Sequence, residues 1–149
     1  MAVQLQFEIE GEKQVSAVLG ITADHVKNFR KPMERIAGEL QKSFQMNFSS
    51  RGALFMPGGW PPRARYYPWP ILEKTGLMRR SFREEVHDDY VVMFNSTPYF
   101  RYHQSNRPRK RLPRRVMMKI DEQRRNFIFK ELQAHILSGM QGRKAQNSG

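Results

Sequence analysis

The chain has 149 residues, which suits one domain with a sizeable core, and it contains no cysteine, which excludes disulfides, thiolate metal sites and a cysteine nucleophile. Its 26 lysines and arginines against 14 acidic residues give a net charge of +12, which attracts nucleic acid or acidic protein surfaces without distinguishing them. The N-terminus lacks the apolar centre of a signal peptide, and no stretch of about 18 apolar residues occurs, so we expect a soluble, unexported protein without a membrane partner.

The N-terminal residues alternate between apolar and polar side chains. Val3, Leu5, Phe7 and Ile9 share one face of an extended chain, which predicts a half-buried strand that ends at Gly11. The following residues 13–21 fit either a second strand or a short helix, and they stay unassigned.

A long amphipathic helix is predicted from Asp24, a good N-cap, to about Asn47. Apolar residues recur there every three or four positions, at Val26, Phe29, Met33, Ile36, Leu40, Phe44 and Phe48. Pro32 requires either a kink or a restart of the helix, and we favour a restart with Pro32 in the first turn.

Residues 49–70 hold five prolines and three glycines among aromatic residues, so we expect a long loop. A loop of this length in a compact domain is usually functional or disordered. The aromatic side chains either form a partner surface between subunits or fold over the protein's own core, and composition does not choose between these alternatives. These side chains are Trp60, Tyr66, Tyr67 and Trp69.

The region from Thr75 to Phe94 predicts a helical turn that leads into a β-hairpin. The two strands are 82–86 and 90–94, with the two aspartates in the turn between them. Thr97 as N-cap and Pro98 at the first helical position then predict a short helix.

The C-terminal part begins with residues 116–120, which fit a last strand. Asp121 is expected to cap a helix whose apolar stripe ends before Ser138 and Gly139. We therefore predict a single domain over residues 1–138 and a flexible tail over residues 139–149. The predicted class is α+β: a small antiparallel sheet packed by a long N-terminal helix and a C-terminal helix, with a long Pro/Gly/aromatic loop.

An acidic cluster in the hairpin is the strongest candidate for catalysis, because clustered carboxylates and a histidine could hold Mg²⁺ in a nuclease. Its members are Glu84, Glu85, His87, Asp88 and Asp89. In a hairpin, however, Glu84 and Glu85 point to opposite faces, and aspartates are common in turns. No hydrolase, nucleotide or histidine-pair motif occurs. We therefore predict no enzyme activity, and no catalytic, cofactor-binding or metal-binding residues.

A basic run without any acid is the strongest candidate for binding. It consists of Arg107, Arg109, Lys110, Arg111, Arg114 and Arg115. Its two prolines keep the chain extended, so the charges could line a groove or lumen and contact phosphates without sequence preference. The alternative is a solvated loop that connects two elements.

In this order the segments resemble the phage virion morphogenesis family, the Mu-type tail-completion or neck proteins. The long helix ends in "FQMNFSSRG", and a Gly-Trp-Pro segment, "GGWPP", follows. Three further motifs match, in "ILEKTGLMRRS", "PYFRYHQ" and "LPRRVMM". The matching positions are Trp60, Ile71, Leu72, Thr75, Gly76, Met78, Arg79, Ser81, Tyr99, His103, Gln104, Pro113 and Arg115.

The resemblance implies a non-enzymatic α+β subunit of a ring in the virion neck between capsid and tail, assembled in the host cytoplasm. The expected partners are further copies of this chain in a ring of six or twelve, neighbouring neck, connector or tail proteins, and genomic DNA that passes through the lumen without sequence specificity. The alternatives are a sequence-independent nucleic-acid-binding protein and, third, a small metal-dependent nuclease.

Overall fold

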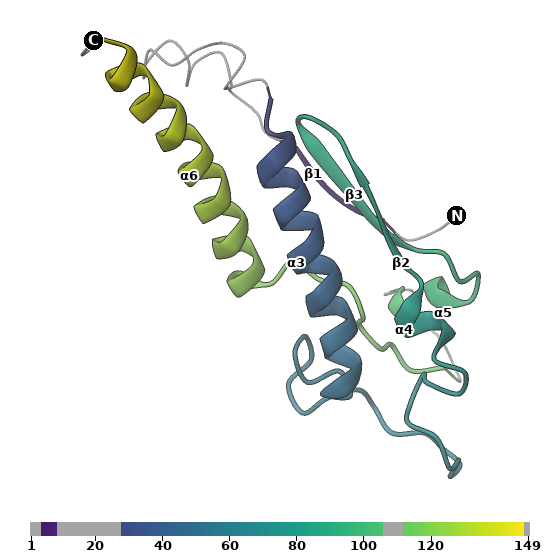
Figure 1. The fold of residues 1–149 in the computed structure, drawn as a ribbon. Helices are drawn as coiled ribbons and strands as arrows, with labels where there is room; N and C mark the ends of the chain where they lie inside the picture. Colours follow the sequence, from purple (N-terminus) through teal and green to yellow (C-terminus); the bar gives the residue numbers. More distant parts are fainter. Residues whose placement is uncertain (1–3, 9–27, 106–111, 148–149) are drawn as a thin grey trace.

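The computed structural model describes residues 4–8, 28–105 and 112–147, with the backbone alone for 4–8 and 140–147. Three strands and four helices occur in this part of the chain, drawn in Figure 1. The residues left unassigned at 13–21 lie outside the described part.

The sheet has three antiparallel strands with β3 in the centre. β1 covers Gln4–Glu8, β2 covers Phe82–Val86 and β3 covers Tyr90–Asn95. Val91 of β3 lies opposite Phe7 of β1 and Val86 of β2. The predicted N-terminal strand and the predicted hairpin are therefore confirmed.

Helix α3 covers Arg30–Ser49, with Pro32 in its first turn and Phe29 at the N-cap. Pro32 thus lies in the first turn of a helix, as predicted, where a proline removes no helical hydrogen bond. The predicted N-cap Asp24 lies outside the described residues. The Phe29 amide donates to the Asp88 carbonyl at 2.8 Å, so the helix start is attached to the hairpin turn.

Helix α6 covers Glu122–Asn147, and a carboxylate oxygen of Asp121 accepts from the Arg124 amide at 3.0 Å. The predicted cap is confirmed, but the predicted helix end before Ser138 is wrong. The helix continues past Gly139, since a single glycine lowers helix stability without ending the helix. Flexibility of residues 139–149 stays a prediction.

Helix α3 lies between the sheet and α6 (Figure 1). The sequence predicted that both long helices pack on the sheet, but α6 packs on α3 instead. The apolar residues of α3 are buried between these two partners, with Met33, Ile36 and Phe44 each 0% exposed. Leu40 of the predicted apolar stripe and Val92 of β3 are buried at 1% and 7% exposure.

The two short helices are α4, Leu77–Arg80, and α5, Phe100–Gln104. Helix α5 starts later than predicted, and its N-cap is Tyr99 and not Thr97. The Thr97 hydroxyl instead donates to the side-chain oxygen of Asn95, whose amide donates to the Met78 carbonyl at 2.8 Å. Thr97 therefore belongs to a link between β3 and α4.

The predicted last strand at residues 116–120 is wrong, because this segment is extended but belongs to no sheet. The α+β class itself is confirmed, with a three-stranded antiparallel sheet, two long helices and a loop over residues 50–76. None of the described helices is long and apolar enough to cross a membrane.

Candidate functional site

The extended segment 116–118 is buried. Side chains from other parts of the chain make the backbone hydrogen bonds that a neighbouring strand would otherwise make. The side-chain oxygen of Gln104 accepts from the amides of Met117 and Met118 at 2.7 and 3.0 Å. The Gln104 side-chain nitrogen donates to the Met118 carbonyl at 2.8 Å. One glutamine from α5 thus satisfies three buried backbone groups, which would otherwise be costly to bury.

The carbonyl of Val116 is satisfied from the other side of the segment. The side-chain nitrogen of Asn47 donates to it at 3.1 Å, and the indole nitrogen of Trp60 donates at 2.9 Å. Asn47 lies in the last turns of α3 and Trp60 in the long loop, so Val116 connects three distant parts of the chain.

Trp60 itself is held by a close approach of Gly52 and is 5% exposed. Gly52 has φ +87°, and a Cβ atom there would lie only 2.2 Å from the indole ring. The ring also packs edge-on against Phe48, with 5.1 Å between the ring centres. Of the two alternatives for the aromatic loop, Trp60 thus takes the one in which the loop folds over its own core.

Arg115 is buried at 4% exposure, although the sequence placed it in the basic run. Its guanidinium donates to the Pro61 carbonyl at 3.0 and 2.8 Å and to the Pro62 carbonyl at 3.3 Å. The pKa of Arg115 is lowered from its ordinary value, mainly because the guanidinium is buried and to a smaller extent because of the positive charge of Arg63. Arg115 therefore fixes the Gly-Trp-Pro segment of its own chain.

The motif around α4 builds a turn. The Thr75 hydroxyl accepts from the Leu77 amide at 3.3 Å, and Gly76 takes the left-handed conformation with φ +72°. Arg79 pairs with Glu73 at 2.8 Å and donates to the Ser49 hydroxyl at 2.6 Å. The Ser81 hydroxyl donates to the Leu77 carbonyl at 2.5 Å, so these residues attach the end of the long loop to α3 and β2.

Most of the remaining motif residues are partly or fully buried around the same region. Met78 is 3% exposed and packs in the core with Ile71 and Leu72 against it. The His103 carbonyl accepts from the Arg115 amide at 2.8 Å. Tyr99 is 41% exposed and Pro113 is partly buried. The motif residues therefore mainly assemble the subunit.

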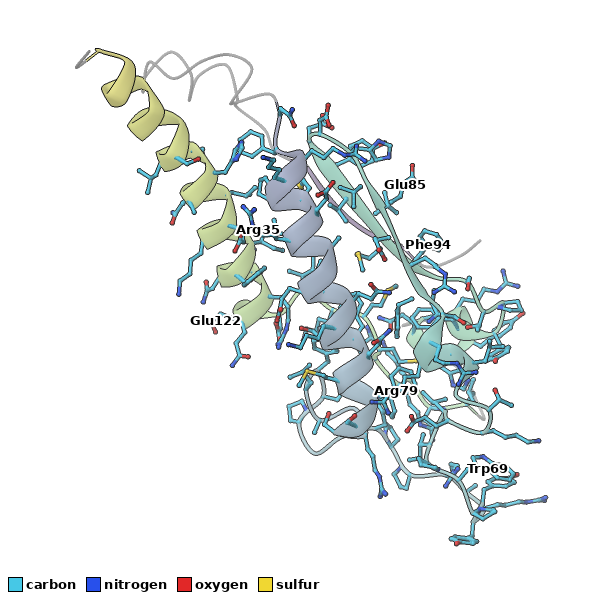
Figure 2. All side chains as sticks on the ribbon, viewed as in Figure 1. Arg35, Trp69, Arg79, Glu85, Phe94 and Glu122 are labelled. Atoms are coloured by element: carbon cyan, nitrogen blue, oxygen red, sulfur yellow. The ribbon has the colours of Figure 1, made fainter. Side chains whose placement is uncertain are left out.

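A basic-aromatic loop, residues 62–74, extends from this core at one end of the molecule, where Figure 2 shows Trp69. The rings of Tyr67 and Trp69 are stacked, with 5.1 Å between their centres. The Arg63 guanidinium lies 5.4 Å from the Tyr67 ring centre, and the Lys74 ammonium lies 5.2 Å from that of Trp69. Such cation–π contacts hold both charges at the surface of the loop.

Two pockets lie beside this stack and share Arg63, Tyr67 and Trp69 as lining residues. The first, of about 540 Å³, is also lined by Arg51 and Arg65, and the second, of about 440 Å³, by Lys74 and His103. No acidic residue lines either pocket in the described part of the chain. Tyr66 is 89% exposed beside them. This loop can bind an anionic partner.

Most of the basic run lies outside the described residues, namely Arg107, Arg109, Lys110 and Arg111. Arg114 is exposed, and its side chain donates to the Gln104 carbonyl at 3.2 Å. The two neighbouring arginines therefore differ: the side chain of Arg114 is exposed at the surface, whereas that of Arg115 is buried inside the subunit.

The acidic cluster extends from the middle of β2, at Glu84, to the turn of the β2–β3 hairpin, at Asp89. Glu85 contacts the His87 ring at 2.7 Å, and Asp88 lies 3.8 Å from Arg30. Among the described residues no group of three or more potential ligands lies close enough together to hold a metal ion.

Asn47 and Arg63 are site residues that the sequence did not predict. Asn47 stands between Phe44 and Phe48 on the apolar stripe of α3, and a polar residue at such a position signals a buried hydrogen bond. Arg63 has no comparable signal in the sequence, since its contact with the Tyr67 ring depends on the conformation of the loop.

Fold and site define a small, strongly basic α+β protein with a cationic surface suited to anionic partners. A family model, the phage virion morphogenesis family, matches residues 11–137. The chain belongs to this family, and the resemblance seen in its motifs is confirmed. Membership indicates a role in the structure or assembly of the phage virion. The comparisons with curated proteins and with solved structures gave no match.

Proposed function

We propose that this chain is a structural protein of the phage neck that joins or completes the connection between head and tail. The family match over residues 11–137 carries the proposal. The exposed basic-aromatic loop agrees with the proposal, because a protein that joins large assemblies needs surface that its own fold leaves uncovered.

In this proposal six or twelve copies form a closed ring, and genomic DNA passes through its lumen. The net charge of +12 supports such a channel, since a positive lining contacts phosphates of any sequence and allows the DNA to slide. The proposed DNA-facing residues are Arg107, Arg109, Lys110, Arg111 and Arg114. Arg115 leaves this set because its guanidinium is buried on the carbonyls of Pro61 and Pro62.

The location is tested by electron microscopy of particles in which this chain carries a visible label. Label in the neck supports the proposal, and label in the capsid shell or along the tail tube contradicts it. Loss of the chain should leave filled heads and complete tails that do not join.

The role of the basic run is tested by changing Arg109, Lys110, Arg111 and Arg114 to glutamine. We expect joined particles that leak DNA or eject it abnormally, because the channel loses phosphate contacts. Free heads and free tails that accumulate together would instead assign the run to docking on a neighbouring protein.

A matched control removes the same number of positive charges, four, from the exposed faces of α3 and α6, and it leaves the basic run intact. Its substitutions are Lys31→Gln, Lys42→Gln, Arg125→Gln and Lys130→Gln. Both variants fall from +12 to +8 (12 − 4), so a defect confined to the first variant is due to position and not to net charge.

A further inference from the structure

The hairpin end is the acidic pole of this basic molecule. Four of the chain's 14 acidic residues lie between the middle of β2 and the turn, and all four are exposed: Glu84 and Glu85 on β2, and Asp88 and Asp89 in the turn. Among the described residues, the His87 ring lies 2.7 Å from Glu85 and the Arg30 guanidinium lies 3.8 Å from Asp88, but no cationic side chain pairs with Glu84 or Asp89. This end therefore carries negative charge that the described part of the chain does not neutralise.

The basic-aromatic loop is complementary to such a surface. Arg63 and Lys74 are held on the rings of Tyr67 and Trp69, and Arg51 and Arg65 line the first pocket beside them. Glu73 lies within the loop, but it pairs with Arg79 at 2.8 Å. The loop therefore presents cations in fixed positions.

Carboxylates suit this loop better than nucleotide bases do. Bases bind cationic surfaces of this kind by stacking on free aromatic faces. The inner faces of Tyr67 and Trp69 are stacked on each other, and each ring also carries a cation. Those cations remain able to bind carboxylate oxygens by charge-assisted hydrogen bonds.

The two surfaces lie at opposite ends of the same molecule. The hairpin turn contacts the start of α3 through Asp88, and the basic-aromatic loop lies beyond the other end of α3 (Figures 1 and 2). At 1.5 Å per residue, the 20 residues of α3 separate them by about 30 Å. One copy therefore cannot join its own two surfaces.

We propose that the acidic hairpin end of one copy docks on the basic-aromatic loop of the next copy. Two different surfaces then meet at every contact, and such a heterologous contact closes into a ring when the rotation between copies allows it. The inference rests on the proposed ring and names the surfaces that build it.

Two surface variants of the full chain test this contact by sedimentation velocity at low salt. The loop variant carries Arg65→Glu and Lys74→Glu, and the hairpin variant carries Glu84→Lys and Asp89→Lys. All four side chains are exposed, and circular dichroism checks that both variants fold. We expect each variant alone to self-associate at least about tenfold more weakly than the parent chain, because like charges meet at the contact.

The decisive sample is an equimolar mixture of the two variants. Each then offers the surface that the other needs, so association should return, and it should also return in a chain with all four substitutions. A control with Lys42→Glu and Lys130→Glu makes the same change in net charge as the loop variant, from +12 to +8 (12 − 4), and should associate like the parent. Unchanged association in both surface variants overturns the inference.

A second test applies to assembled particles, where copies are held together even if the free chain associates weakly. Because the sequence contains no cysteine, Tyr66→Cys and Asp89→Cys introduce the only thiols. The double variant should give a ladder of disulfide-linked copies longer than dimers, and each single variant at most dimers. Particles that contain the chain but give no ladder overturn the contact. Particles that lack the chain contradict the proposed function instead, and the sedimentation test then decides the contact.

Discussion

At the scale of single residues, Gln104 shows that a residue of a weak sequence motif can hold a buried segment in place. The His-Gln pair at the end of α5 gives no hint in the sequence of which groups it contacts. In the structure the side chain of Gln104 makes three hydrogen bonds with the backbone of Met117 and Met118. The position requires both an acceptor and a donor, which only an amide side chain offers in this geometry.

Replacing Gln104 by methionine keeps the volume and removes both polar groups. Three buried backbone groups then lack partners, so the free energy of unfolding should fall by at least about 2 kcal/mol. Urea unfolding measures this loss. Gln133→Met, on the exposed side of α6, is the matched control and should change the free energy by less than about 0.5 kcal/mol. Equal losses in both variants would show that the three bonds do not stabilise the fold.

Gly52 allows a second test at this scale. Gly52→Ala places a methyl group against Trp60 and a non-glycine residue at φ +87°, where conformational strain alone costs about 1 to 3 kcal/mol. Gly38→Ala, on the exposed side of α3 with no atom within 4 Å of a new methyl group, should instead stabilise the protein by about 0.5 to 1 kcal/mol. Thermal unfolding should therefore shift in opposite directions, and a shift in the same direction would contradict the role given to Gly52.

At the scale of elements, local patterns predicted what local forces determine. The position of Pro32 in the first turn of α3, the Asp121 cap and the hairpin each follow from the conformations that nearby residues allow. The segment 116–118 was mistaken for a strand because its apolar residues fit one. Its partners are side chains of Asn47, Trp60 and Gln104, and no pattern within the segment reveals contacts so distant in sequence.

The placement of α6 was missed for a similar reason. Its stripe correctly identifies a buried face, and Ile128 is 6% exposed. An apolar stripe does not say whether it meets a sheet or another helix. The contact of Arg35 on α3 with Glu131 on α6, at 2.6 Å, shows that the partner is α3.

Helix α3 is therefore the central element, and its core residues should be the most sensitive to truncation. Leu40→Ala should lower the free energy of unfolding by about 2 to 5 kcal/mol, because Leu40 is 1% exposed and its loss leaves a cavity. Leu137→Ala makes the same change at a site on α6 that is 54% exposed and should cost far less. If the Leu40 variant kept the stability of the parent chain, the central position of α3 in the core would be contradicted.

At the scale of the whole molecule, burial divides the aromatic loop into two parts with different roles. Trp60 is 5% exposed and bonded to Val116 inside the subunit, whereas Tyr66 and Tyr67 are 89% and 39% exposed. Trp69 lies between these extremes, in the stack with Tyr67. The sequence offered all four as one aromatic group, since their different roles depend on the path of the loop and not on composition.

This division predicts how the two tryptophans respond to assembly. In the free subunit acrylamide should quench Trp69 and leave Trp60 largely protected, because quenching requires contact with the ring. In the virion Trp69 should become protected as well, since the proposed contact between copies covers its loop. Trp69→Phe keeps an aromatic ring in the stack and reports Trp60 alone, so the difference from the parent chain isolates Trp69. Protection of Trp60 that appears only in the virion would contradict the buried position of its indole. Quenching of Trp69 that is equal in free subunit and virion would leave the basic-aromatic loop exposed after assembly, and a contact between copies through that loop would then be wrong.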